Sequence, residues 1–570
     1  MLLRSQVRGG MLERLVVRNF RSLDELDLML EPLTALVGPN GAGKSAALEA
    51  IDLVIGDRWP SMRSLRIPED WTLFETSRDL VIQTWFGPAL EYEDAMGDVK
   101  DVHGFEFSCK PYKKRTKRAE PGDLHDDNRL LDAKGELVMG CVRSPRKGRP
   151  PEFGPLSFNG GIRDQGRALF IDARRDVVRH LPGRRNAALA RLLAPARKEF
   201  EQGDTPAVKD FKEQYERAME TLRTPRVQEV EEVIEGTTKR MLGFLGSATV
   251  RDLQVGFGFA DPANPFSSLR IQCREGELGL PAELMGQGVQ SALVVGIFEA
   301  LRQLSEHDVG TVLLEEPEMY LHPQAQRYFY GVLKQLVDEQ DAQVIYTTHS
   351  TTFADMARFE SVRLLRRLPD GPTHATWMRD EADRDFLERQ RASEKLAQYF
   401  DPTGSELLFA HRVLLVEGHG DQLAARQVAE SLGVDVDAED LAIVSSGGKN
   451  RLPFFARACR ALEIPFVVLH DLDILPVDEP EDGEARPQDA DAATRRWREN
   501  EQAERDNSAI VEAAGDPSVV YGVSSSLEAA LGISRNADNK PRRIVETLQQ
   551  LEPSDYPEAL TAAVRALAEM

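Results

Sequence analysis

Carboxylates follow apolar runs at two places in this sequence. The segment LLVEGHGD carries Glu417 and Asp421, and the segment VVLHDLD ends with Asp471 and Asp473. Short apolar runs bounded by Gly or Asp are typical of buried strands, and alternate residues of an extended chain point to the same side. Carboxylates held this close repel one another unless cations bind, and their hard oxygen atoms favour Mg²⁺ or Mn²⁺ over zinc. The pattern therefore predicts a divalent-metal site at two strand ends.

A phosphate-binding loop lies upstream, in the segment LTALVGPNGAGKSAALEAI. It matches the pattern G-x-x-x-x-G-K-S between an expected strand at 33–37 and an expected helix. Backbone N–H groups of such a loop wrap phosphates, and the helix N-terminus adds positive potential. We expect Lys44 to contact the β- and γ-phosphates of ATP, and Ser45 to ligate Mg²⁺. The predicted ATP-binding residues of the loop are Gly38, Asn40, Gly41, Gly43, Lys44 and Ser45.

Two more strand ends would complete an ATPase site. The segment TVLLEEP predicts a buried strand that ends in Glu315, which would hold the Mg²⁺ shell, and Glu316, which would polarise the attacking water. The segment QVIYTTHS contains His349, which would face the γ-phosphate where its strand runs parallel to the others. Each signal is weak alone, but together with the phosphate-binding loop they indicate ATP hydrolysis.

The whole chain is acidic, with 71 Lys and Arg against 94 Asp and Glu, a formal net charge of −23 over 570 residues. This balance disfavours a passive nucleic-acid coat, but it leaves room for local basic surfaces. The clusters KPYKKRTKR at 110–118 and RSPRKGR at 143–149 are the candidates for contacting a DNA backbone. Solvated loop charge is an equally good explanation of both clusters.

Neither targeting nor membrane segments are expected. The N-terminal sequence MLLRSQVRGGMLERLVV lacks the continuous apolar core of a signal peptide, and we find no apolar run of membrane-spanning length. The four cysteines are scattered without a CxxC pair, which argues against disulfide frameworks and zinc sites. We therefore expect a cytoplasmic protein that has no membrane partner.

Periodicity divides the chain into two α/β parts with helical segments between them. We assign 1–172 and 246–380 to the two portions of the ATPase, and 173–245 to a helical insertion that could serve in dimerisation. Residues 381–411 read as a charged connector, and 412–570 as the second α/β domain. Two stretches are expected to be irregular: 87–165 as loop-rich, and about 476–506 as a flexible insertion or solvated helix.

The nucleotide-binding part resembles the ATP-binding-cassette (ABC) ATPases of the recombination-and-chromosome-maintenance type. The resemblance rests on the phosphate-binding loop together with LERLVVRNFRSL, LLEEPEMYLHP and YTTHS. In that family two heads sandwich the nucleotide, which implies a homo-oligomer, either a dimer or a tetramer. The segment MGQGVQS at 285–291 is the nearest candidate for the signature loop that reaches across, but it departs from LSGGQ by lacking the serine.

The carboxylate-bearing part resembles the Toprim domain of topoisomerases, primases and some nucleases, in which a glutamate follows the first strand and a DxD follows a later one. SSSLEAALG adds Glu528 after another apolar run, and NKPRRIVETL adds Lys540. An ATPase head followed by Toprim, in this motif order, resembles the OLD family of nucleases (overcoming lysogenisation defect). The nuclease subunit of the Gabija phage-defence system belongs to the same group.

This resemblance implies an α/β fold, with an ABC-type P-loop ATPase head that carries a helical insertion, followed by a Rossmann-like Toprim domain. It implies an ATP-regulated endonuclease that cleaves DNA with two metal ions, in anti-phage defence, with a helicase-like protein among its partners. Glu417 would serve as metal ligand and general base, and Lys540 would stabilise phosphate charge. The implied metal ligands are Glu417, Asp421, Asp471, Asp473 and Glu528.

Three other functions were weighed against the nuclease. An ATP-dependent DNA clamp or repair scaffold would use the same domains without cleavage. A primase-like polymerase is disfavoured by the missing zinc-binding motif and by the cassette ATPase. A topoisomerase needs a nucleophilic tyrosine, and only Tyr521 and Tyr556 follow the acidic pair, neither in a recognisable nucleophile setting.

Overall fold

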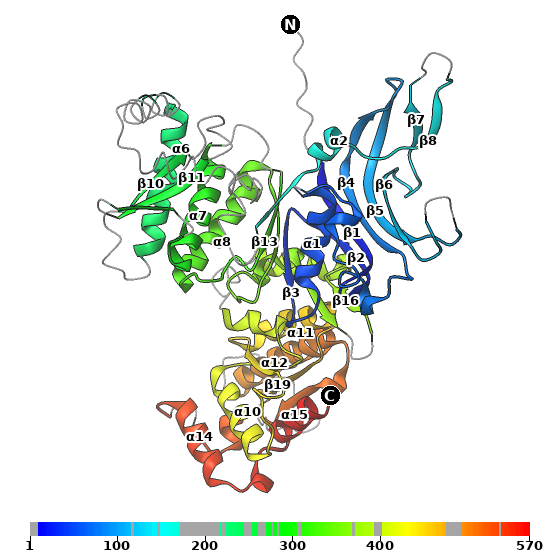
Figure 1. Ribbon diagram of the computed structural model, residues 1–570. Helices are drawn as coiled ribbons and strands as arrows, with labels where there is room; N and C mark the ends of the chain where they lie inside the picture. Colours follow the sequence, from blue (N-terminus) through cyan, green and yellow to red (C-terminus); the bar gives the residue numbers. More distant parts are fainter. Residues whose placement is uncertain are drawn as a thin grey trace. The chain divides into compact units, whose positions relative to one another are not determined.

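The computed structural model divides the chain into two compact units (Figure 1). The first consists of Met1–Thr34 and Ser45–Thr348, and the second of Ala35–Lys44 and His349–Met570. The structure describes residues 10–56, 58–115, 119–144, 149–171, 214, 217, 221, 224–243, 253–259, 269–275, 278–281, 284–304, 310–367, 371–392, 402–474, 492–534 and 537–570. Among these residues, no helix is long and apolar enough to cross a membrane.

The first unit opens with a five-stranded antiparallel sheet. Its strand order is β2-β1-β4-β5-β6, and the hairpin of β7 and β8 follows in the chain. The bounds are β1 Met11–Phe20, β2 Leu23–Met29, β4 Leu80–Glu93, β5 Val99–Pro111, β6 Leu124–Leu131, β7 Met139–Arg143 and β8 Glu152–Pro155. The expectation of a loop-rich stretch at 87–165 was therefore wrong. β6 reads as polar (LHDDNRLL) because it is an edge strand that buries only Leu130 and Leu131.

Three parallel strands form the second layer of the first unit. β13 (Thr311–Glu315) lies between β9 (Ala168–Ile171) and β14 (Gln343–Thr347), and the Val344 N–H donates to the carbonyl oxygen of Pro32. β13 and β14 read as nearly continuous apolar runs, because helices cover parallel sheets on both faces. The remaining elements here are α1 (Lys44–Ile55, of which Lys44 belongs to the second unit), α2 (Gly160–Gln165), α6 (Pro225–Gly243), α7 (Gln287–Leu304), α8 (Pro323–Gln340) and the antiparallel strands β10 (Leu253–Phe259), β11 (Leu269–Glu275) and β12 (Leu278–Pro281).

The helix α6 falls within the predicted insertion at 173–245, and nearly all the rest of that segment lies outside the described residues. The predicted domain boundaries remain predictions.

The second unit begins with the end of β3 (Leu33–Val37), which continues into it from the first unit. β3 pairs in parallel with β15 (Val362–Arg367), and β16 (Thr373–Thr376) pairs antiparallel with β15. The helix α9 (Glu381–Ala392) and the 3₁₀ helix η6 (Pro402–Leu408) lie in the predicted connector.

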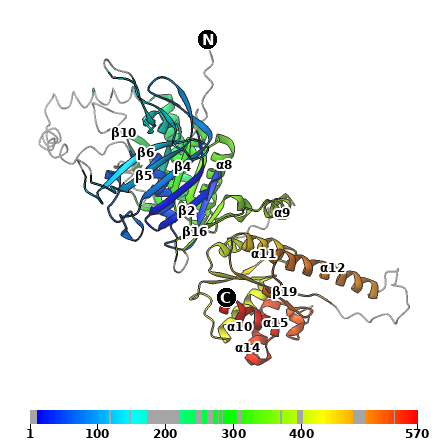
Figure 2. The same ribbon diagram turned by 90° about the vertical axis from the view of Figure 1, so that its right-hand side faces the viewer.

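A four-stranded parallel sheet forms the C-terminal part of the second unit. Its order is β18 (Leu441–Ser445), β17 (Arg412–Val416), β19 (Phe466–Asp471) and β20 (Val520–Val523). The helices α10, α14 and α15 share one apolar core with one face of this sheet, whereas α11 and α12 contact its strands outside that core (Figure 2). Their bounds are α10 His419–Ser431, α11 Leu452–Ala461, α12 Ala492–Ala514, α13 Leu527–Ala530, α14 Lys540–Gln550 and α15 Glu558–Glu569. The solvated helix expected near 476–506 corresponds to α12, while 475–491 lies outside the described residues.

The chain order of these strands creates a switch point in the sheet. After β17 the chain goes outward to β18, and then returns to β19 on the opposite side of β17. In open α/β sheets, the crevice between two such strands, at their carboxyl ends, is the usual place for a ligand. β17 and β19 are the two strands whose ends carry the predicted carboxylates.

Candidate functional site

The two strand ends bring Glu417 and Asp471 into direct contact. β17 and β19 pair in parallel with Val416 opposite Leu469, so the residues that follow emerge at one edge. The Asp471 N–H donates to Glu417 Oε1 at 2.8 Å. The Asp471 side chain is held in turn, because its Oδ1 accepts a hydrogen bond from the Leu527 N–H at 2.9 Å.

Asp421 joins the cluster from the first turn of α10. Its Oδ2 accepts a hydrogen bond from the Gly418 N–H at 2.9 Å, which satisfies an amide at the helix start. The helix N-terminus also favours a negative charge at this position.

Asp473 lies beyond the end of the strand. β19 stops at Asp471, and Asp473 adopts a left-handed conformation with φ +56°, so the extended backbone considered from the sequence does not continue to it. The Asp473 N–H donates to the carbonyl oxygen of Ser525 at 2.8 Å. Its Oδ2 accepts a hydrogen bond from Lys449 Nζ at 2.9 Å.

Glu528 and Lys540 come together from two helices. Glu528 lies in the first turn of α13, where Ser526 caps the helix, and Lys540 is the first residue of α14. Lys540 Nζ lies 3.4 Å from Glu528 Oε1. Two residues that the Toprim resemblance implied are therefore neighbours.

Electrostatics ties all five carboxylates into one group. Burial raises the pKa of Glu417 to about 7, that of Asp421 to about 6 and that of Asp471 to about 8. Repulsion contributes to each shift: Asp421 and Asp473 raise the pKa of Glu417, and Glu528 raises that of Asp421. Carboxylates that resist ionisation in this way are stabilised by an added cation.

The donor set suits a hard divalent cation, because every group that it offers is a carboxylate. As the side chains lie, no three His, Cys, Asp or Glu residues of the described chain enclose a common metal position. Cation binding would therefore require side-chain adjustment in this group.

In the phosphate-binding loop, Lys44 is folded back onto the backbone. Its Nζ donates to the carbonyl oxygens of Gly38 at 2.8 Å and Pro39 at 2.9 Å, and the side chain is buried. Gly38 has φ +142°, and a Cβ there would lie 2.0 Å from the carbonyl oxygen of Leu365 on β15. The loop glycines Gly41 and Gly43 also have positive φ, and Asn40 is exposed.

His349 lies near Lys44 and also contacts the C-terminal part of the second unit. Burial, followed by the charge of Lys44, lowers the pKa of His349. The imidazole stacks on Phe409 with 6.4 Å between ring centroids and 29° between planes. Phe409 directly follows η6 and precedes β17, the strand that Glu417 follows.

The remaining ATPase residues belong to the first unit. Glu315 ends β13, and Ser45 lies in the first turn of α1. Glu316 has φ +45°, and its N–H donates to both the carbonyl oxygen and Oγ1 of Thr347 at 3.1 Å. The ends of β13 and β14 are thereby joined.

The signature-like loop at 285–291 leads into α7. Gln290 Nε2 donates to the carbonyl oxygen of Met285 at 2.9 Å, and Ser291 Oγ donates to that of Met319 at 3.3 Å. These contacts hold the loop against its own unit. A signature role for this loop stays a prediction.

The basic clusters are only partly within the described residues. Lys113, Lys114 and Arg115 are exposed at the end of the β5–β6 hairpin, while 116–118 and 145–148 lie outside. Arg115 pairs with Glu120 at 3.1 Å, and Arg143 pairs with Glu152 at 3.3 Å. Acidic neighbours therefore offset part of this positive charge.

Sequence reasoning missed a role for Lys449. The available signal was the glycine-rich segment SSGGKN, which follows an apolar run in the sequence. In the fold this turn follows β18, and Lys449 Nζ donates to Asp471 O at 2.5 Å as well as to Asp473.

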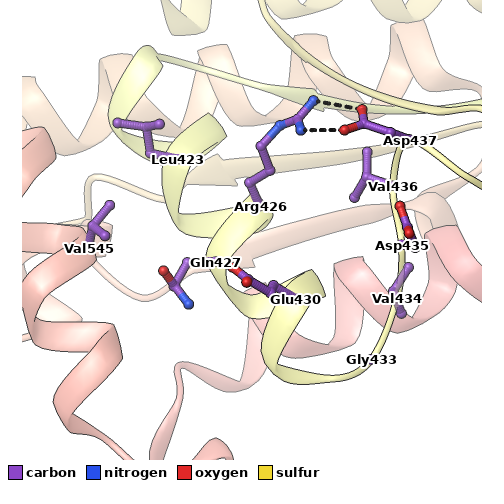
Figure 3. Close-up of a pocket in the computed structure, with 10 residues that line it drawn as sticks. All are labelled: Leu423, Arg426, Gln427, Glu430, Gly433, Val434, Asp435, Val436, Asp437 and Val545. Carbon is purple, nitrogen blue, oxygen red and sulfur yellow. Dashed lines mark hydrogen bonds and ion pairs between the residues drawn. The ribbon is translucent and has the colours of Figure 1, made fainter.

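A separate hollow of about 590 Å³ lies between α10, the loop at 433–437 and α14 (Figure 3). Leu423, Val434, Val436 and Val545 supply its apolar lining, and Arg426 forms an ion pair with Asp437 at its edge. None of the predicted site residues lines it.

Comparison with known proteins finds two families. The family described as AAA ATPase domain matches residues 11–129 and 184–354, and the family described as Overcoming lysogenization defect protein-like, TOPRIM domain, matches 408–473. The OLD nuclease of Thermus scotoductus is 46% identical over 558 residues, which are 98% of this chain and 98% of that protein. The Old nuclease of Escherichia phage P2 is 21% identical, over 80% of this chain and 76% of its own.

Among solved structures, the Smc head bound to the C-winged helix domain of ScpA aligns with a TM-score of 0.37 at 15% identity. The alignment covers 66% of this chain and 99% of that one.

Proposed function

Because this chain belongs to the OLD nuclease family, we propose that it is an ATP-regulated, metal-dependent DNA endonuclease with a two-metal Toprim centre. The observation that carries the proposal is the contact between Asp471 and Glu417 at the switch point of the parallel sheet. It joins two of the five carboxylates that interact electrostatically, and a group of carboxylates with raised pKa values is typical of a functional site.

The chain's own residues suit the roles that we assign to them. Glu417 has a pKa of about 7, so it can accept a proton from water near neutral pH as well as bind metal. Asp421, Asp471, Asp473 and Glu528 would serve as the other ligands, and Lys540 would stabilise phosphate charge. Bound Mg²⁺ or Mn²⁺ would lower the pKa of a water and stabilise the leaving oxygen of the phosphodiester.

The ATPase head would regulate cleavage. Lys44 and the loop from Gly38 to Ser45 would bind the phosphates, Glu315 would hold Mg²⁺, Glu316 would polarise water and His349 would sense the γ-phosphate. The ring contact between His349 and Phe409 supports communication with the Toprim part.

We further propose a role in anti-phage defence in the cytoplasm, as a homo-oligomer (dimer or tetramer) with a helicase-like partner. The role and the partner are inferred from the motif order, an ATPase head followed by Toprim, which resembles that of the Gabija nuclease subunit. The basic clusters at 110–118 and 143–149 would contact DNA. Survival of phage-challenged cells that express wild-type protein or Lys44→Ala tests the biological role. Equal plaque counts with and without the wild-type protein would refute it.

Plasmid nicking tests the enzymatic proposal. In Mg²⁺ or Mn²⁺ the wild-type protein should nick plasmid DNA, and Asp471→Ala with Asp473→Ala should lower the rate by at least about a hundredfold, because both are proposed ligands. Lys44→Ala should change only the response to ATP. Cleavage that survives the double substitution would exclude the Toprim centre as its source.

A DNA clamp without nuclease activity is not favoured, because the full-length relative is a nuclease. A clamp would bind DNA in an ATP-dependent way and would not nick it in any metal.

A further inference from the structure

Lys449 places an ammonium group among the carboxylates of the second unit. Its Nζ donates to Asp473 Oδ2 at 2.9 Å and to the carbonyl oxygen of Asp471 at 2.5 Å. The Lys449 side chain is 11% exposed, whereas that of Asp473 is 40% exposed. The lysine is therefore the buried partner of this ion pair, and its charge acts on the centre more than on the solvent.

The turn that carries Lys449 is tied to the opposite strand end. The Gly448 N–H donates to the carbonyl oxygen of Glu417 at 2.8 Å, and Ser446 Oγ donates to the same oxygen at 3.3 Å. Gly447 and Gly448 have φ values of +73° and +142°, which favour glycine. The turn after β18 is thus anchored at the end of β17, and it places the Lys449 ammonium at the end of β19.

We propose that Lys449 is a resident cation of the centre, which holds Asp473 until a divalent cation replaces it. The lysine and that cation then compete for one carboxylate. This inference rests on the proposed metal-dependent function, because Asp473 is one of the proposed ligands. Lysine suits such an exchange, because its ammonium binds as a point charge on a flexible stem and not through a rigid fork.

A competing cation and a structural strut have opposite effects on metal binding. A competitor weakens binding of the divalent cation at Asp473, since the ion pair must break first. A strut strengthens binding, since it holds the ligand in place. Removing the ammonium therefore separates the two roles by the direction of the change.

Isothermal titration of the metal-free full chain with Mn²⁺ tests the proposal. Lys449→Gln should tighten Mn²⁺ binding at the site that includes Asp473 by roughly threefold or more, because one charge-assisted ion pair no longer opposes the metal. Lys449→Arg should weaken the same site, because a guanidinium binds a carboxylate through two parallel hydrogen bonds. Lys449→Gln should therefore bind Mn²⁺ most tightly, wild type less tightly and Lys449→Arg least tightly.

Two controls make the result specific. Arg426→Gln removes one positive charge from an exposed ion pair with Asp437 in the same unit, and it should leave Mn²⁺ binding unchanged. In an Asp473→Asn background, Lys449→Gln should no longer alter Mn²⁺ affinity, because the competed carboxylate is gone.

The outcomes distinguish this inference from the function on which it rests. Unchanged or weaker Mn²⁺ binding by Lys449→Gln would overturn the competition. Should that variant fail to fold, binding by Lys449→Arg that equals or exceeds wild type would overturn it equally. A wild-type protein that binds no Mn²⁺, or binding that survives Asp471→Ala with Asp473→Ala, would instead overturn the proposed function.

Discussion

At the scale of single residues, main-chain amides orient the carboxylates of the centre. Glu417, Asp421 and Asp471 each accept a hydrogen bond from a backbone N–H, donated by Asp471, Gly418 and Leu527 respectively. Because these amides are fixed by strand pairing and helix starts, the positions of the acids follow from the fold. The fold therefore brings these three carboxylates together before any cation binds, and the remaining adjustment is of side chains.

The raised carboxylate pKa values predict how the metal-free protein responds to pH. Glu417, Asp421 and Asp471 have folded-state pKa values of about 7, 6 and 8, above their ordinary values near 4. Their contribution to stability is fully present below the unfolded values and is lost as the pH rises through the folded ones. The melting temperature in EDTA should therefore fall between pH 5 and roughly pH 8.

Mn²⁺ should reverse this loss, and by more at pH 8 than at pH 6, because metal binding releases protons from these acids. Asp471→Asn is the matched variant, since it keeps the shape but cannot ionise, and its melting temperature should depend less on pH. A wild-type melting temperature in EDTA that stays level or rises over this range would contradict the assignment.

At the scale of elements, the strands whose ends hold the site residues were the ones that the sequence predicted. β3, β13, β17 and β19 are short apolar runs that end in Glu or Asp or are directly followed by Gly or Glu. The sequence therefore located both the phosphate-binding loop and the carboxylates. β6 was missed, because an edge strand with one wet face carries few apolar residues. Strand order was beyond reach as well, because pairing between strands far apart in the chain leaves no local pattern.

The geometry beyond a strand end could not be read from sequence either. Asp473 leaves the extended conformation at φ +56°, and Lys449 reaches it from a turn more than twenty residues earlier. Residue types alone gave no reason to pair that lysine with the DLD segment. The identity of the acids was thus predictable, whereas their neighbours were not.

The packing of β3 against β15 predicts the effect of one substitution. Gly38→Ala should abolish ATP binding and destabilise the protein by about 2 kcal/mol or more, because its Cβ would overlap the Leu365 carbonyl and its φ is unfavourable. Gly41→Ala is the control, with a positive φ but nothing within 4 Å of its Cβ, so it should cost about 1 kcal/mol. Nucleotide titration and urea unfolding measure both. Equal effects of Gly38→Ala and Gly41→Ala would show that the close approach of the Leu365 carbonyl does not restrict residue 38.

At the scale of the whole molecule, the phosphate-binding loop and the carboxylates share one compact unit. Ala35–Lys44 and His349 group with the Toprim part, whereas Glu315 and Glu316 belong to the other unit. The chain thus crosses between units within one phosphate-binding motif. A division of the sequence into continuous domains does not reveal this arrangement, because Ala35–Lys44 is only ten residues long.

Phe409 should couple ATP binding to DNA cleavage, and Phe409→Leu tests this coupling. The substitution removes the ring that stacks on His349 but keeps an apolar side chain. The effect of ATP on the nicking rate should then be several-fold smaller than in wild type, while the affinity for ATP without DNA stays the same. An unaltered response to ATP would mean that control passes elsewhere.

If the proposed coupling through His349 and Phe409 operates, control is reciprocal. Thermodynamic linkage requires that, if ATP changes the affinity of the chain for DNA, DNA changes the affinity for ATP by the same factor. Binding at the nuclease centre would then affect the ATPase site, as well as being affected by it. DNA bound near Glu417 would set how firmly nucleotide is held beside His349, so the ATPase would register whether the nuclease is engaged.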